Sequence, residues 1–262
     1  MLSISFAIGY LLTLLVGLSI GLLGSGGSIL FLPILVYLFN INPSNANTYC
    51  NLIVGITSAI AFINYIVKHK INVKYCAFFL LFSTFFTYIG KNYIVNLLPE
   101  FIWIIPKSSL LMLIFSGIMI FASLQISNST LTENINKKVL YIKFIFSACF
   151  VGLITGMLGA GAGFLIVPIF LSVLKVPFSQ AIGSSLLIIA INSLSFLIYT
   201  PLNSINISNE ILLCLAFAII GMLIAIFFIS NKISTNNLKK LLKIIILSLG
   251  IIIFISEILK LV

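Results

Sequence analysis

A glycine-rich apolar stretch, GLLGSGGSILFLP, spans Gly21 to Pro33. A stretch of the same pattern, GMLGAGAGFLIVP, spans Gly156 to Pro168 in the second half of the chain. In each copy a glycine-rich run interrupts an apolar segment, and a proline follows within ten residues. Glycine runs cost a helix conformational entropy, so we expect each helix to break there. A short second helix then begins, which Pro33 or Pro168 should kink. The two stretches therefore predict two broken helical hairpins.

Both hairpins belong to a longer internal duplication. Placing the second half on the first at an offset of 135 positions (17 to 152) aligns five glycine and proline pairs without a gap: Gly17 with Gly152, Gly21 with Gly156, Gly24 with Gly159, Gly26 with Gly161, and Pro33 with Pro168. The same register aligns Ser58 with Ser193. Such self-similarity indicates a structural repeat. We expect one membrane repeat over 1–126 and another over 139–262, joined by a polar cytoplasmic connector over 127–138.

The composition indicates a lipid bilayer as the surroundings of these repeats. Hydrophobic residues make up 61% of the 262 positions and charged residues 7%, far below the roughly one quarter that soluble domains carry. Ten apolar segments are expected, near 3–23, 28–39, 46–67, 75–97, 107–126, 141–158, 163–174, 180–200, 210–230 and 241–260. Most approach the length of about 20 residues that crosses a bilayer. The sequence predicts an all-α polytopic membrane protein with about eight to ten membrane segments.

Lysine positions orient the two repeats. Three clusters, at 68–74, 137–143 and 232–243, mark cytoplasmic loops. The loops at the equivalent positions of the other repeat carry Glu210 and Glu100 instead. Opposite charge at equivalent loops predicts an inverted repeat. Both termini are then outside if each short segment contributes to a crossing, whereas a re-entrant hairpin would put the N-terminus inside. Loop lysines also account for the net charge of +10, so nucleic acid is not expected as a partner.

The helix breaks are the candidate anion site. A break inside the membrane leaves backbone N–H groups free at the positive end of the next short helix, where an anion can bind. The residues concerned are Gly24, Ser25, Gly26, Gly27, Ser28, Gly159, Gly161 and Gly163. Polar side chains on the helices that follow are further candidates for substrate binding: Ser58, Ser184, Ser185, Asn192 and Ser193. For these side chains the alternative is ordinary hydrogen bonding between helices.

Six residues are expected to have a structural role: Gly17, Gly21, Pro33, Gly152, Gly156 and Pro168. Glycines spaced by four residues form a stripe on one helix face, which lets another helix approach closely. Tight packing alone is therefore the alternative role of all the duplicated glycines.

Other chemistry receives little support from the residues. The four cysteines have no paired spacing that suits a metal, and we expect neither a metal nor a cofactor. Gly183 to Ser185 could be taken for a nucleophile motif, but His69 is the only histidine and falls in a loop, so we do not expect an enzyme. The four glutamates fall at loops or segment ends, which argues against a proton relay. Lys91 is the most interior cation and either snorkels or attracts anions.

The two glycine and proline stretches, together with AIGSSL from Ala181 to Leu186, resemble the TauE/SafE family of sulfite exporters and related anion permeases. At the equivalent place the first repeat has NANTYCNL, Asn45 to Leu52. The resemblance implies a multi-pass protein of the cytoplasmic membrane that exports sulfite, an organosulfonate or a related organic acid. Its expected partners are this small anion and the lipid bilayer, and the sequence leaves a homo-oligomer open. The alternative is a non-transporting assembly factor or scaffold.

Overall fold

The computed structural model describes residues 2–24, 27–68, 71, 73–94, 97, 99, 101–102, 105–127, 137–158, 163–198, 200, 208–229 and 234–261. Within these ranges the fold is helical, apart from a small hairpin of β1 (Phe101–Ile102) and β2 (Ile105–Pro106). Helices pair their backbone groups internally, which apolar segments need wherever water is absent. The predicted all-α class is confirmed.

Each of the ten apolar segments contains an α-helix. In the first half these are α1 (Leu2–Leu23), α2 (Gly27–Tyr37), α3 (Pro43–Lys68), α4 (Val73–Ile89) and α6 (Lys107–Ser127). In the second half they are α7 (Lys137–Leu158), α8 (Gly163–Ser172), α9 (Phe178–Ile198), α10 (Asn209–Ile224) and α11 (Thr235–Leu261). Two π-helical segments, η1 (Gly90–Ile94) and η3 (Ala225–Ile229), continue α4 and α10.

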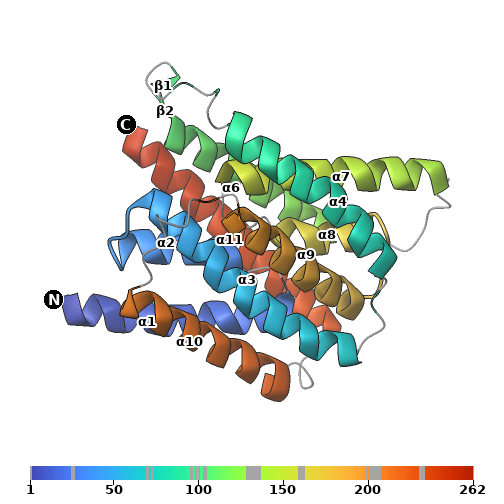
Figure 1. Ribbon diagram of the computed structural model, residues 1–262, viewed down its shortest axis with the longest axis horizontal. Coiled ribbons are helices and arrows are strands. Elements are labelled where there is room, and N and C mark those ends of the chain that lie inside the picture. The colour runs from blue at the N-terminus through green and yellow to red at the C-terminus, as the bar shows by residue number, and fades with distance from the viewer. Residues whose placement is uncertain are drawn as a thin grey trace.

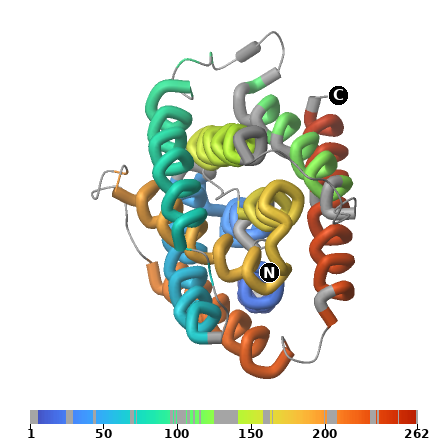
Figure 2. The backbone as a smooth tube through the Cα atoms, turned by 90° about the vertical axis from the view of Figure 1, so that its right-hand side faces the viewer, coloured from blue at the N-terminus to red at the C-terminus, as the bar shows by residue number. Residues whose placement is uncertain are grey.

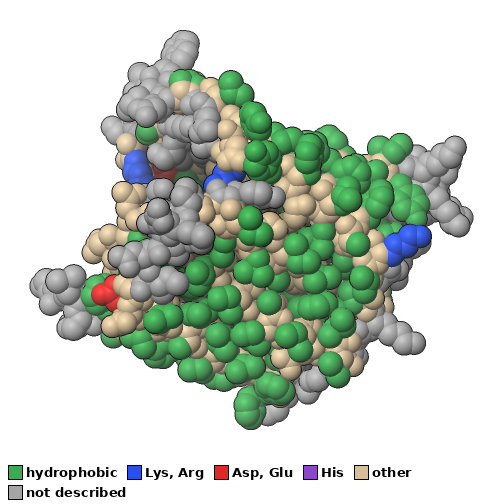
Figure 3. Space-filling model, viewed as in Figure 1, with side chains coloured by type: hydrophobic (Ala, Val, Ile, Leu, Met, Phe, Trp, Pro, Cys, Tyr) green, Lys and Arg blue, Asp and Glu red, His purple; other side chains and the backbone are tan. Residues whose placement is uncertain are grey.

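Six helical stretches of the described chain are long and apolar enough to cross a membrane: Phe6–Leu23, Asn45–Val67, Val73–Ile94, Phe178–Ile198, Asn209–Ile229 and Asn236–Lys260. Two shorter apolar helices, Met112–Leu124 and Tyr141–Met157, accompany them. Large apolar side chains are exposed along these helices, for instance Leu81 and Phe146. Hydrophobic atoms cover most of the face in Figure 3. The chain is therefore a multi-pass membrane protein.

Helices α3 and α9 pack against each other in the middle of the molecule. The pair α1 and α10 lies on one side of them and the pair α4 and α7 on the other (Figure 1). Helices α6 and α11 form a further pair along one flank (Figure 2). Every one of these four pairings joins a helix of the first half to a helix of the second. The two halves of the chain are thus interleaved.

The elements of the two halves correspond at the same offset of 135 positions (2 to 137). Under that shift the bounds of α1 coincide with those of α7, and the bounds of η1 with those of η3. The contact of α1 with α10 then corresponds to the contact of α7 with α4. In Figure 1, α1 runs from the left-hand end to the right, whereas α7 begins at the right-hand end. In this view α1 and α7 thus run in opposite directions.

Glycines let the paired backbones touch. A Cβ atom on Gly17 would collide with the carbonyl oxygen of Ala218 in α10, and one on Gly152 would collide with that of Ser83 in α4. Ser83 and Ala218 are themselves separated by the repeat offset. This is the close approach that the glycine stripes predict.

We expect Gly17→Ala and Gly152→Ala to destabilise the protein by about 1 to 3 kcal/mol each, because the new methyl group meets backbone that cannot move aside. Gly117→Ala in α6 is the matched control, since a Cβ there has nothing within 4 Å. It should leave stability unchanged or raise it, because alanine is the better helix former. The measurement is the thermal unfolding midpoint of each purified variant in detergent. A midpoint for Gly17→Ala equal to that of Gly117→Ala would contradict the packing role.

Candidate functional site

The first helix break lies buried against the second repeat. Helix α1 ends at Leu23, and Gly24 follows with a φ of +67°, a left-handed conformation that glycine adopts readily. The Ser185 hydroxyl on α9 lies 2.8 Å from two acceptors, the Gly24 carbonyl oxygen and the Ile182 carbonyl oxygen of its own helix, and shares its one proton between them. One turn earlier, the Tyr65 hydroxyl on α3 donates to the Gly21 carbonyl oxygen at 3.2 Å. Carbonyls that the end of α1 leaves free are thus paired by two other helices.

The rest of the glycine runs is described only in part. Ser25, Gly26, Gly159 and Gly161 lie outside the described residues, while Gly27 and Gly163 begin α2 and α8. Ser28 lies in the first turn of α2, and Pro33 and Pro168 lie inside the two short helices. Helix α2 packs on α3, α8 packs on α9, and the two short helices contact each other. The helices that follow each break therefore meet inside the protein.

Two candidate serines stand apart by their lack of partners. The Ser58 and Ser193 side chains are fully buried, and neither hydroxyl has a hydrogen-bond partner among the residues that the structure describes. A Cβ atom on Gly55 would lie 3.2 Å from the Ser193 Cβ atom, and Ser58 is one helical turn, about 4.5 Å, further along α3. Ser193 on α9 thus packs against α3 about one helical turn from Ser58. Buried polar groups are nearly always paired, so this exception needs a physical reason.

The other candidate side chains contact protein atoms. Asn192 Oδ1 accepts a hydrogen bond of 3.1 Å from the Ser83 hydroxyl on α4. Ser185 donates to α1 as described above, and Ser184 on α9 is buried beside the Cys76 thiol. For Asn192 and Ser185 the geometry favours a bond between helices.

The first break and the two serines occupy different depths. Ser185, which contacts Gly24, and Ser193 are eight residues apart on α9, a rise of about 12 Å. The sequence grouped these residues as one site. The structure instead separates Gly24 from the region of Ser58 and Ser193.

Few charged groups enter the helical core. Glu257 is buried near the end of α11, where its carboxylate pairs with Lys260 Nζ at 2.6 Å. Lys91 Nζ reaches from η1 to the end of α9 and donates to the Thr200 hydroxyl at 2.7 Å. Within the described residues no group of three His, Cys, Asp or Glu side chains is arranged to hold a metal ion.

Sequence reasoning missed Tyr65, whose hydroxyl reaches the end of α1. Its signal was weak, because a tyrosine in an apolar helix is typical of many packing positions. It also missed the π-helical segments η1 and η3. Their signal lay in the duplication, since both fall at the same place in the two repeats.

The sequence matches the protein family described as "Sulfite exporter TauE/SafE" over residues 9–253. A probable membrane transporter protein of Xylella fastidiosa strain Temecula1 is 30% identical over 195 residues, which cover 72% of this chain and 70% of that protein. A probable membrane transporter protein of Methanocaldococcus jannaschii is 27% identical over 260 residues, covering 92% and 93% of the two chains. No solved structure matches the chain with significance.

We expect Ser185→Ala to lower stability by about 1 to 2 kcal/mol, because the buried Gly24 carbonyl loses its donor. Ser147→Ala is the control, since the Ser147 hydroxyl bonds only to the Lys143 carbonyl of its own helix. Thermal unfolding of both variants in detergent measures the difference. Equal midpoints would mean that the bond between the repeats adds nothing to stability.

Proposed function

Because the chain belongs to the sulfite exporter TauE/SafE family, we propose that it exports a small anion across the cytoplasmic membrane. Sulfite, an organosulfonate or a related organic acid fits this proposal. The two relatives carry the name of probable membrane transporters, and the family is one of transporters rather than of enzymes. The six long apolar helices agree with passage through a bilayer.

The observation that carries the proposal is the pair of unpaired, buried hydroxyls of Ser58 and Ser193. Each can donate one hydrogen bond to an oxygen of a bound oxyanion and so replace part of its hydration shell. Neutral donors hold an anion without fixing a charge that would trap it. A buried location between α3 and α9 also favours a small substrate. In this proposal the two serines form the central binding position.

The helix breaks then serve as the approaches to this position. Backbone N–H groups of 25–28 and of Gly159, Gly161 and Gly163 would stabilise an arriving anion, whereas the N–H group of Gly24 is bonded to the Ile20 carbonyl oxygen. Ser184, Ser185 and Asn192 support α9 beside that path. The breaks are related by the repeat, so one of them would serve each side of the membrane.

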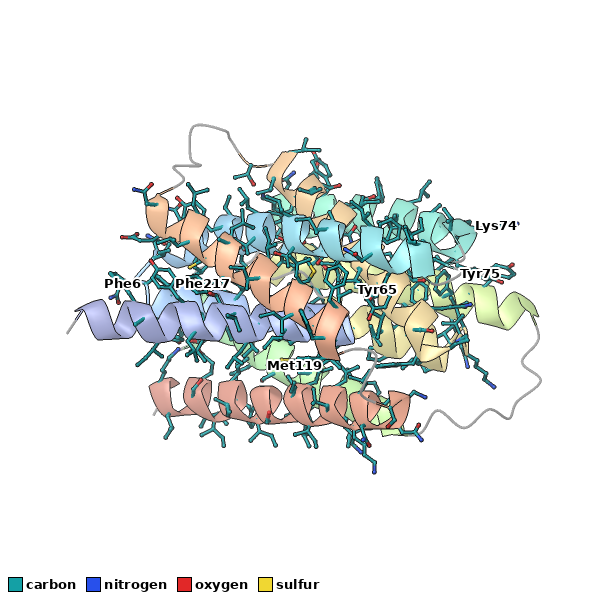
Figure 4. The ribbon with its side chains drawn as sticks, turned by 90° about the horizontal axis from the view of Figure 1, so that it is seen from below. Phe6, Tyr65, Lys74, Tyr75, Met119 and Phe217 are labelled. Carbon is teal, nitrogen blue, oxygen red and sulfur yellow. The ribbon has the colours of Figure 1, made fainter. Side chains whose placement is uncertain are left out.

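An inverted repeat would explain how the binding position opens to one side of the membrane and then to the other. The opposite directions of α1 and α7 support it, as do the paired contacts of the two halves. If repeat 1 (1–126) and repeat 2 (139–262) exchange conformations, the central position opens to the other side. Lys74 lies at the end of the molecule opposite Phe6 (Figure 4), so the lysine clusters put that end in the cytoplasm and the termini outside.

Replacing the two serines should separate transport from stability. We expect Ser58→Ala and Ser193→Ala to raise the KM for sulfite or methanesulfonate about fivefold to tenfold each, as lost hydrogen bonds to a charged ligand do. The unfolding midpoint of the empty protein should not fall, because each change removes a hydroxyl that has no partner. Flux into vesicles containing the purified variants gives the KM.

Ser123→Ala is the matched control, because the Ser123 hydroxyl is buried but bonds within its own helix. Its KM should equal that of the wild type. Wild-type protein that moves neither anion would contradict the transport proposal and favour a scaffold. Unchanged KM values in both serine variants would place the binding position elsewhere.

We expect the membrane potential to drive transport of the anion, with no proton carried together with it. The buried carboxylate Glu257 already pairs with Lys260 near the end of α11, so we expect Glu257→Gln to keep potential-driven flux. A potential of 100 mV, negative inside, contributes about 2.3 kcal/mol for each negative charge expelled. Flux of methanesulfonate is measured in vesicles at a set potential, with and without a pH gradient. Uphill accumulation driven by pH alone at zero potential would show proton coupling.

A further inference from the structure

One half-buried cation, Lys91, lies among the helices on the outer side of the molecule. It belongs to η1, which continues α4 to the end opposite Lys74. Its Nζ atom donates hydrogen bonds to the Thr200 hydroxyl at 2.7 Å and to the Phe196 carbonyl oxygen at 3.3 Å. The same atom lies 3.7 Å from the centre of the Phe196 ring. These groups hold the ammonium at the end of α9.

The backbone of Lys91 also touches the helix that leads into the second glycine run. A Cβ atom on Gly156 of α7 would lie 2.9 Å from the Lys91 backbone nitrogen. Helix α7 ends at Leu158, two residues beyond Gly156, and α8 begins at Gly163. Lys91 therefore lies next to the end of α7 that precedes the second break.

Among the described residues, no such charge lies beside the first repeat's break. The repeat offset places Ile226 of η3 where η1 has Lys91, and Ile226 is buried. The surroundings otherwise correspond, since η3 packs on α1 beside Gly21 as η1 packs on α7 beside Gly156. At this equivalent position, the two repeats thus have a cation beside one break and an apolar side chain beside the other.

The charge of Lys91 meets only neutral partners among the described residues. Glu257 is paired with Lys260, and Glu210 is exposed beside Ser208. An ammonium has three N–H donors; two meet the acceptors named above, and the third is left to the Phe196 ring or to a ligand. An ionisable residue at membrane depth is costly, and such residues usually mark an ion path. The π-helical backbone around Lys91 also supports a functional role for this lysine, because such segments are frequent at functional sites.

We propose that Lys91 Nζ is the charged contact for the substrate anion at the outer mouth, beside the second break. This inference rests on the proposed transport function and adds to it that the two mouths are unequal. The outer mouth binds the anion through a full positive charge, whereas the cytoplasmic mouth offers backbone and hydroxyl groups alone. Affinity on the outer side should then rise with the number of negative charges on the substrate.

The test compares Lys91→Met and Lys91→Arg with the wild type in right-side-out and inside-out membrane vesicles. The probes are methanesulfonate, with one negative charge, and methanedisulfonate, with two. We expect Lys91→Met to raise the KM at the outer face about tenfold for the monoanion and more for the dianion, as the loss of a charged hydrogen bond does. The KM at the cytoplasmic face should stay within about twofold, and Lys91→Arg, which keeps the positive charge, should restore a lower outer KM than Lys91→Met.

Two controls distinguish a charged contact at the outer mouth from a general effect of losing a lysine or of misfolding. Lys74→Met removes an exposed lysine at the opposite end, and it should leave the outer KM unchanged. The unfolding midpoint shows whether Lys91→Met still folds. If Lys91→Met does not fold, the proposal is tested by two other measurements. These are the KM of Lys91→Arg and the difference in wild-type KM between the monoanion and the dianion at each face.

An equal KM for Lys91→Met and the wild type at the outer face would overturn the proposal while leaving transport itself intact. The proposal would also be overturned if the wild-type protein had the same ratio of KM values for the monoanion and the dianion at both faces. A loss of flux that is equal for both anions and is not restored by arginine would assign Lys91 to capping α9 alone. Absence of flux in the wild type would instead contradict the proposed function.

Discussion

Direct contact between helix backbones is the constraint on which the rest of this structure depends. Gly17 of α1 against α10, and Gly152 of α7 against α4, bring the helices so close that no side chain fits between them. In a bilayer there is no hydrophobic force between helices, so this contact area supplies much of the association. It also fixes the positions of α1 and α7 up to their ends. The breaks, and the short helices that follow them, are set in place by these two contacts.

Much of the fold could be predicted because its determinants are local. Apolar length marks the helices, and glycine runs mark their interruptions, as at the end of α1. The duplication was visible because glycine and proline at matched positions cannot arise from an Ile-rich composition alone. The small β1–β2 hairpin carried no such signal. Whether a helix crosses the whole membrane was also harder to predict, since α6 and α7 contribute only short apolar stretches.

The candidate site could be predicted only in part, because a hydroxyl's partner depends on tertiary register. Ser185 and Ser193 look alike in sequence, yet one donates to Gly24 and the other has no partner. Which serine meets a carbonyl is decided by how α9 is rotated against α1 and α3. The separation of about 12 Å between the first break and the two serines likewise follows from helix rise and register, not from residue type.

The bond between Ser185 and Gly24 has a consequence for the resting state of the protein. At the equivalent position of the other repeat stands Cys50, and a thiol is a weaker donor than a hydroxyl. Two conformations that exchange the roles of the repeats would have equal energies only if the repeats were identical. A difference of about 1 kcal/mol, typical of one such bond, populates one conformation roughly fivefold over the other. If the chain alternates between two such conformations, this difference would favour one of them before any substrate or voltage acts on it.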